Sequence, residues 1–166
     1  MDTKKILKYD LFNNFSEEEL APLLKVMHNQ SFEADETIIS ENDSGDSIML
    51  LLDGTVSVSK ALTMKMNQSL KREKEFTKLT ASEKPFFGEI SIFNDNKRTA
   101  TIKAETTCEI GIFYNKDIIK ICNNNHEVGY KIMTNISKKL IDDLLLTNEQ
   151  VLKLTTAFSL IIDKHI

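Results

Sequence analysis

One stretch of the chain decides the fold, and it reads Phe87-Gly88-Glu89-Ile90-Ser91-Ile92-Phe93-Asn94-Asp95-Asn96-Lys97-Arg98-Thr99-Ala100-Thr101. Its glycine lets backbone N–H groups approach a ligand closely, because glycine has no side chain and tolerates unusual dihedral angles. Successive N–H groups at the start of a helical turn, here Glu89 to Ile92, form an anion cradle. Arg98 adds a charged fork suited to phosphate. This stretch, which we call the cassette (residues 87–101), predicts a phosphate-binding site.

The composition narrows the class of protein. A chain of 166 residues fits one domain. Its net charge of −4 argues against a general nucleic-acid or anionic-membrane surface. The N-terminus lacks the apolar region of a signal peptide, and no run of about 18 apolar residues predicts a membrane span. Cys108 and Cys122 lie in apolar patterns, which predicts reduced core cysteines in a cytoplasmic protein.

Upstream of the cassette, a helical segment precedes several short strands. Ser16 followed by three glutamates predicts a capped helix start within a helical region over residues 10–31. Residues 61–78 are polar and charged, which predicts a long hairpin tip or a mobile loop. Alternating or buried apolar runs predict strands at Thr37–Ile39, Ile48–Leu52, Val56–Ser59, Ala100–Ala104 and Ile110–Ile112. The pattern favours an α+β fold, an antiparallel β-roll of the jelly-roll type between an N-terminal helix and long C-terminal helices.

The C-terminal third predicts a long helix. Three asparagines at 123–125 break the chain, and a helical period runs from Glu127 onward. A second stripe of Ile141, Leu145 and Leu152 is expected to pack back on the roll. Spacings of three and four residues predict a dimeric coiled-coil seam at Leu140, Leu144, Thr147, Val151, Leu154, Phe158 and Ile161. The alternative is a single amphipathic helix lying on its own domain.

With these residues in view, the chain resembles the cyclic nucleotide-binding domain family over roughly residues 12–146. The resemblance rests on Phe87-Gly88-Glu89-Ile90 followed by Arg98-Thr99-Ala100-Thr101, with Ser44-Gly45-Asp46-Ser47 and Leu52-Asp53-Gly54 upstream. It implies that the β-roll binds cAMP or cGMP as a ligand, with no cofactor, no metal and no catalysis. It also implies two parts, residues 1–126 with the N-terminal helix and the roll, and residues 127–166 as a lid and dimerisation helix.

The resemblance implies a role for individual residues. Glu89 would accept from the ribose 2′-hydroxyl, and Arg98 would pair with the cyclic phosphate, beside Phe87. The backbone amides of Gly88, Ile90 and Ala100 would contact phosphate or ribose. Thr99 stands where some members meet the guanine amino group, without deciding the base. Asp143 and Leu144 fall near the base-reading positions, although a solvent-facing Asp142-Asp143 pair is an equal alternative.

Several features leave the function open. Lys84-Pro85 stands where the family usually has Gly-Asp, and Lys97 replaces a common proline. The chain ends at Ile166, so we expect no separate output domain and no DNA contact, and the charge and the lack of an apolar span predict no membrane contact. The leading hypothesis is a homodimeric sensor that signals to an unknown downstream protein. A degenerate, ligand-free dimeric interaction module is the alternative. A metal enzyme on a β-roll is a third class, disfavoured because His28, His126 and His165 are dispersed.

Overall fold

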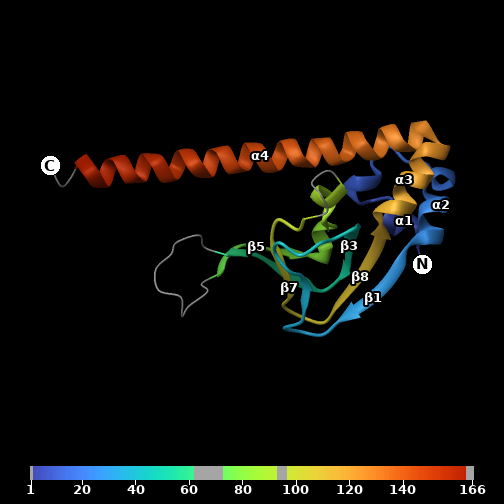
Figure 1. Ribbon diagram of the computed structural model, residues 1–166, viewed down its shortest axis with the longest axis horizontal. Helices are drawn as coiled ribbons and strands as arrows, with labels where there is room; N and C mark the ends of the chain where they lie inside the picture. Colours follow the sequence, from blue (N-terminus) through green and yellow to red (C-terminus); the bar gives the residue numbers. More distant parts are fainter. Residues whose placement is uncertain (1, 62–72, 93–96, 164–166) are drawn as a thin grey trace.

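The computed structural model describes residues 2–61, 73–92 and 97–163 as an eight-stranded β-roll with helices at one end and along one side (Figure 1). In chain order the elements are α1 (Thr3–Ile6), η1 (Asp10–Phe12), α2 (Glu17–Val26), β1 (His28–Phe32), β2 (Thr37–Ile39), β3 (Ser47–Asp53), β4 (Thr55–Ala61), β5 (Glu73–Thr80), η2 (Ala81–Glu83), β6 (Phe86–Phe87), η3 (Glu89–Ile92), β7 (Thr101–Ala104), β8 (Cys108–Tyr114), α3 (Asn115–Asn124) and α4 (His126–Asp163). The predicted antiparallel β-roll with flanking helices is confirmed.

Two four-stranded antiparallel sheets form the roll. One has the strand order β1-β8-β3-β6 and the other β2-β7-β4-β5. The tight turn between β3 and β4 uses Gly54, whose φ of 90° favours glycine. β3 lies inside its sheet, which explains why the run from Ile48 to Leu52 is continuously apolar.

Successive side chains of β3 serve different parts of the core. Ile48 and Leu50 pack in a cluster with the helices, whereas Met49 and Leu51 pack between the two sheets. The same division separates Phe86 from Phe87 in β6. The cassette therefore begins on a strand that is fixed on both faces.

The N-terminal segment differs from the predicted helix over residues 10–31. Ser16 does form the predicted capping box with Glu19, and the α-helix runs from Glu17 to Val26. Residues 28–32 form β1, which pairs with β8 along its whole length. Residues 28–31 are polar and exposed. They form a strand nevertheless, because pairing with the buried strand β8 determines their conformation.

The polar segment predicted as a hairpin tip or loop is partly strand. Residues 73–80 form β5 and pair with β4, which ends at Ala61, so the prediction of a hairpin tip or mobile loop is wrong for residues 61 and 73–78. Residues 62–72 lie outside the described part of the chain.

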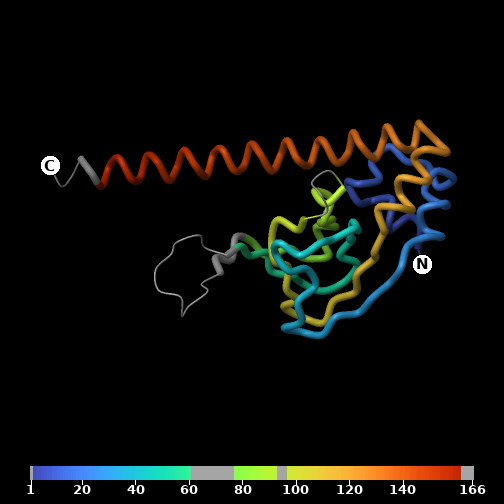
Figure 2. Tube along the Cα trace, viewed as in Figure 1, coloured from blue at the N-terminus to red at the C-terminus, as the bar shows by residue number. Residues whose placement is uncertain are grey.

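The C-terminal helices follow β8 directly. α3 precedes a break at Asn125, and α4 starts at His126, one residue before the predicted start. Asn135 fastens α4 to the N-terminal segment, because its Nδ2 donates to the carbonyls of Leu11 at 3.0 Å and Asn13 at 2.9 Å. Figure 2 shows α4 running along the roll and continuing well past it.

Only the first part of α4 contacts the core. Leu140 is the last of its residues that packs there, and residues 141–161 are all exposed. The prediction that Ile141, Leu145 and Leu152 pack on the roll is wrong, since they are 55%, 57% and 67% exposed. Of the predicted seam, Leu140 packs on the core of its own domain, whereas the residues from Leu144 to Ile161 are exposed, and their pairing with a second chain stays a prediction.

Candidate functional site

The cassette bends sharply at Gly88. Gly88 has a φ of 85°, and the predicted helical turn follows as η3 from Glu89 to Ile92. A Cβ at Gly88 would lie 2.5 Å from Nη1 of Arg98 and 2.8 Å from the Ser47 carbonyl oxygen. Both the backbone conformation and the space therefore require glycine here. Residues 93–96 of the cassette lie outside the described chain.

Arg98 is buried, with 7% of its surface exposed. Its Nη1 donates to the carbonyl oxygens of Ser47 at 2.8 Å and Gly88 at 3.2 Å, with a longer contact to Ser91 Oγ at 3.4 Å. Its Nη2 donates to Ser47 Oγ at 2.9 Å. Gly45 lies against the same side chain, where an added Cβ would overlap Nε. The guanidinium is thus held in place before any ligand arrives.

The bonds of Arg98 leave one edge of the guanidinium available. A guanidinium has five N–H donors, and within the described chain Nε and the second hydrogen of Nη2 have no hydrogen-bond acceptor. These two donors share an edge, which is the fork that pairs with two oxygens of a phosphate. The arrangement suits an anion.

The charge of Arg98 has no close carboxylate partner among the described residues. Burial lowers the pKa of Arg98 from its ordinary value, and the more distant Asp46 and Glu89 carboxylates oppose that shift. A buried cation without a close counter-ion is costly. An anionic ligand would supply the missing charge.

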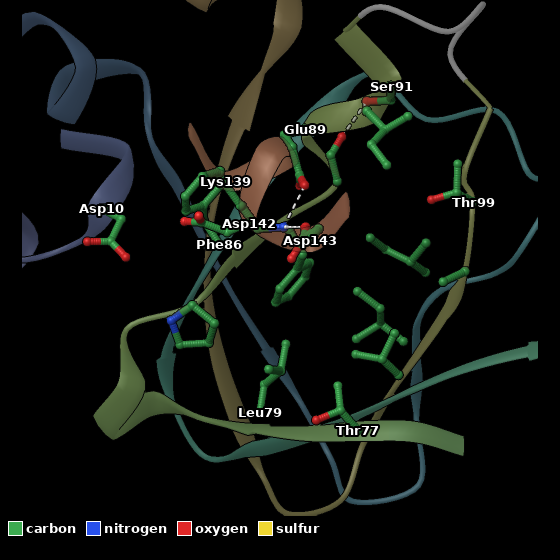
Figure 3. Close-up of a pocket in the computed structure, with 18 of the residues that line it drawn as sticks. Asp10, Thr77, Leu79, Phe86, Glu89, Ser91, Thr99, Lys139, Asp142 and Asp143 are labelled. Atoms are coloured by element: carbon green, nitrogen blue, oxygen red, sulfur yellow. Dashed lines mark hydrogen bonds and ion pairs between the residues drawn. The ribbon is translucent and has the colours of Figure 1, made fainter. Parts of the chain in front are cut away.

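Glu89 is also buried, and a lysine from α4 contacts it. Its side chain is 4% exposed, and Lys139 Nζ lies 2.7 Å from its Oε1. Figure 3 shows Lys139 between Glu89 and Asp143, the latter also at 2.7 Å. Burial would lower the pKa of Lys139, but the Glu89 and Asp143 carboxylates outweigh it and raise that pKa. The group predicted to read a ribose hydroxyl is therefore linked directly to α4.

A cavity of about 550 Å³ joins these groups. The roll forms one wall through residues such as Ile39, Val58 and Leu79, and α4 forms another from Asn135 to Asp143. Figure 3 shows Thr99 and Asp10 on opposite sides of it. Its volume falls in the usual range for sites that hold a small organic ligand.

The structure brings most of the predicted site residues together. The cavity is lined by Phe87, Gly88, Glu89, Ile90, Arg98, Thr99, Ala100 and Asp143. Leu144 is not in its lining and is 58% exposed, so this structure does not bring it to the others. Asp142 lines the cavity too, and both Asp142 and Asp143 are exposed to solvent, so the alternative of a solvent-facing pair stays open.

Three residues that contribute to the site were not predicted as site residues from the sequence. Lys139 stands four residues before Asp143, a spacing that pairs opposite charges on a helix, and this signal was available. Phe86 lies under Lys139, with Nζ 5.5 Å from the ring centre. Ser47 holds Arg98 through its carbonyl and its hydroxyl, and nothing in the local pattern indicates that contact.

Two further properties concern metals and membranes. Across residues 2–61, 73–92 and 97–163, no group of three or more His, Cys, Asp or Glu side chains is placed to hold a metal ion. No helix in these same ranges combines the length and apolar character needed to cross a membrane.

Comparison with known proteins gives the family. The chain is 35% identical over 94 residues to cGMP-dependent protein kinase, isozyme 1, of Drosophila melanogaster, a match that covers 57% of this chain and 12% of the kinase. A cyclic nucleotide-binding domain from Methylobacillus flagellatus superposes with a TM-score of 0.76 at 23% identity, covering 90% of this chain and 80% of that one. Catabolite activator protein from Thermus thermophilus superposes with a TM-score of 0.69 at 18% identity, covering 84% and 62%.

The two structural likenesses show a shared fold. The family model of the cyclic nucleotide-binding domain matches residues 29–125, which is more than half of the chain and contains the whole cassette. The chain belongs to the cyclic nucleotide-binding domain family.

Proposed function

We propose that the protein is a cyclic-nucleotide sensor, which binds cAMP or cGMP in the 550 Å³ cavity and responds by rearranging its C-terminal helices. The observation that carries the proposal is the buried Arg98, which is pre-positioned and lacks a close carboxylate partner in the described chain. A cyclic phosphodiester has one negative charge, so one arginine suffices to neutralise it. Binding without catalysis and without DNA contact is part of the proposal, in keeping with the net charge of −4.

The ligand's ribose and base would lie toward α4. Glu89 would accept from the 2′-hydroxyl through its second oxygen, Oε2, since Oε1 already accepts from Lys139. Asp143 would accept from the amino group of adenine or from N1–H of guanine. Thr99 lines the cavity on the roll side and suits either base.

The response would leave through α4. A ligand shifts a conformational equilibrium only by its differential affinity for the two states. Lys139 supplies such a difference, because its bond to Glu89 changes when a hydroxyl shares the carboxylate. We propose that exposed seam residues of α4 pair with a second copy and transmit the change to a downstream protein in the cytoplasm.

Calorimetric titration with cAMP and with cGMP tests the proposal. Denatured protein should first be analysed by mass spectrometry for copurified nucleotide. We expect saturable binding of at least one nucleotide, lost in Arg98→Gln and kept in Lys120→Gln, which removes an exposed charge from α3. Absence of heat and of a thermal shift at millimolar ligand, with no copurified nucleotide, would refute it.

One observation favours the alternative of a ligand-free interaction module. Both ligand-reading groups already have partners in the protein, since Lys139 contacts Glu89 and backbone carbonyls hold Arg98. The Arg98→Gln comparison decides between the two, because a module that needs no ligand would show no saturable binding in either form.

A further inference from the structure

Asn115 has a buried polar atom without a partner. It is the first residue of α3 and 7% exposed, and its Oδ1 has no hydrogen-bond partner within the described chain. A side chain of this type near a helix start ordinarily caps backbone N–H groups. α3 nevertheless begins without a side-chain cap. Because an unpaired buried oxygen is costly, its position calls for another explanation.

The amide nitrogen of Asn115 faces the cassette. Nδ2 lies 3.5 Å from Oγ of Ser91, which is 1% exposed. Nη1 of Arg98 contacts the same oxygen at 3.4 Å. Both distances are at the outer limit for a hydrogen bond. Two donors thus share one hydroxyl oxygen through long contacts, and only Nη1 has shorter bonds elsewhere, to the Ser47 and Gly88 carbonyls.

The hydrogen of that hydroxyl is already committed. Ser91 Oγ donates to the Gly88 carbonyl at 2.8 Å, and the same carbonyl also accepts from Arg98 Nη1 and from the Ser91 backbone. Three donors for two lone pairs make this acceptor crowded, while Asn115 Oδ1 has none. Hydrogen bonding around Ser91 is therefore uneven, because one acceptor has more donors than lone pairs and another acceptor has no donor.

The backbone connects Asn115 to the other side of Arg98. Its N–H donates to the Asp46 carbonyl at 2.6 Å, within the loop whose Gly45 and Ser47 hold the guanidinium. The first residue of α3 therefore meets the surroundings of Arg98 at two points, Ser91 and this segment.

We propose that Asn115 couples the occupancy of Arg98 to the first turn of α3. The inference rests on the proposed function, since a cyclic phosphate held at the free Nε and Nη2 edge would shift the whole guanidinium and so lengthen the contact of Nη1 with Ser91. Asn115 then closes its hydrogen bond to the vacated oxygen, and the start of α3 tightens against the cassette. Asn115 does not line the ligand cavity, so it acts as a positioning residue through Ser91.

Hydrogen exchange of α3 tests the coupling without any ligand. Arg98→Lys removes Nη1, and we expect amide exchange over residues 116–121 to slow about fivefold, the factor that one hydrogen bond provides. In an Asn115→Ala background the same change should have no effect. The matched control Asn124→Ala, an exposed asparagine of the same helix, should keep the full response. Slowing that persists in Asn115→Ala, or no slowing in the native background, overturns the proposal.

A second variant and a ligand arm complete the test. Ser91→Ala removes the shared acceptor, so it should abolish the response as Asn115→Ala does, and a surviving response also overturns the coupling. Saturating cAMP or cGMP should slow α3 exchange in the native protein only. If neither nucleotide binds, the proposed function fails, and the Arg98→Lys arm alone decides the coupling.

Discussion

Lys139 Nζ lies 2.7 Å from Oε1 of Glu89, which joins α4 directly to the cassette. The carboxylate is buried and the lysine is 28% exposed, so most of the pair is shielded from water. Electrostatic interactions strengthen in such surroundings, and leaving either charge alone is costly. The stability of the site and the position of α4 are therefore linked.

Removing Lys139 should destabilise the protein. We expect Lys139→Met to lower the free energy of unfolding by about 2 kcal/mol, because it leaves the Glu89 charge buried without its partner. Urea denaturation measures the loss. Lys138→Met, an exposed neighbour on the same helix, is the control and should change little. Combining Lys139→Met with Glu89→Gln should lose less than the sum of the two single changes, and simple additivity would contradict the pairing.

A methyl group at Gly45 should disturb Arg98. The φ of Gly45 is not in the left-handed region, so alanine fits the backbone, but its Cβ would overlap the arginine side chain. We expect Gly45→Ala to weaken nucleotide binding at least tenfold and to cost about 1–3 kcal/mol of stability through overpacking. Calorimetry and thermal melting measure the two effects. Ser44→Ala, at the exposed neighbouring position, should bind like the native protein; unchanged affinity in Gly45→Ala would refute the role of the guanidinium's position.

The seam on α4 should hold two chains together. Val151 and Phe158 are 53% and 70% exposed, and burying such side chains favours association. We expect light scattering at tens of micromolar to give twice the 18.9 kDa chain mass. Val151→Asp combined with Phe158→Asp should yield a monomer, while the control pair Gln150→Asp and Thr156→Asp, off the seam, should stay dimeric. A native monomer at this concentration contradicts the seam.

Acid should weaken the contact between α2 and α4. Lys131 Nζ lies 2.6 Å from Oε1 of Glu19, and its hydrogen bond lowers the pKa of Glu19 below the ordinary 4.5. A lowered carboxyl pKa contributes stability that is present above the unfolded-state value and is lost as pH falls through the folded-state value.

Urea midpoints between about pH 6 and about pH 3 measure this effect. Glu19→Gln keeps an acceptor for the capping box but cannot titrate, so we expect its stability to fall less steeply below pH 4.5 than that of the native protein. Glu17→Gln, in the same first turn, is the control. Parallel curves for Glu19→Gln and the native protein would show that the ion pair has no such role.

The sequence predicted the roll and the turn at Gly88 well because both depend on local signals. Gly88 and Gly54 occupy positive-φ positions that few other residues tolerate, and the apolar run from Ile48 to Leu52 is buried up to Leu51 and half-buried at Leu52. β1 lacked such a signal. Its polar residues adopt a strand only because β8 lies beside them, and pairing between distant segments leaves no periodic pattern in a polar edge strand.

The prediction for α4 failed where the roll ends. Periodicity identifies the apolar faces of a helix but carries no information on how far a partner extends along it. Ile141 and Leu145 therefore looked equivalent to residues that do pack, such as Ile132 and Ile136. The contact of Lys139 with Glu89 was missed for a related reason, because the two residues lie fifty positions apart in the chain, although the spacing of Lys139 from Asp143 was a local signal.

Because α4 is long, a small rotation at the site produces a large displacement at the far end of the helix. At about 1.5 Å per residue, the 38-residue helix is about 57 Å long, and about 36 Å of it extends beyond Lys139. A pivot of about 10° at the Glu89 contact would sweep the far end through about 6 Å. A sub-ångström adjustment around one carboxylate can thus become a displacement as large as a side chain at the tip of the helix.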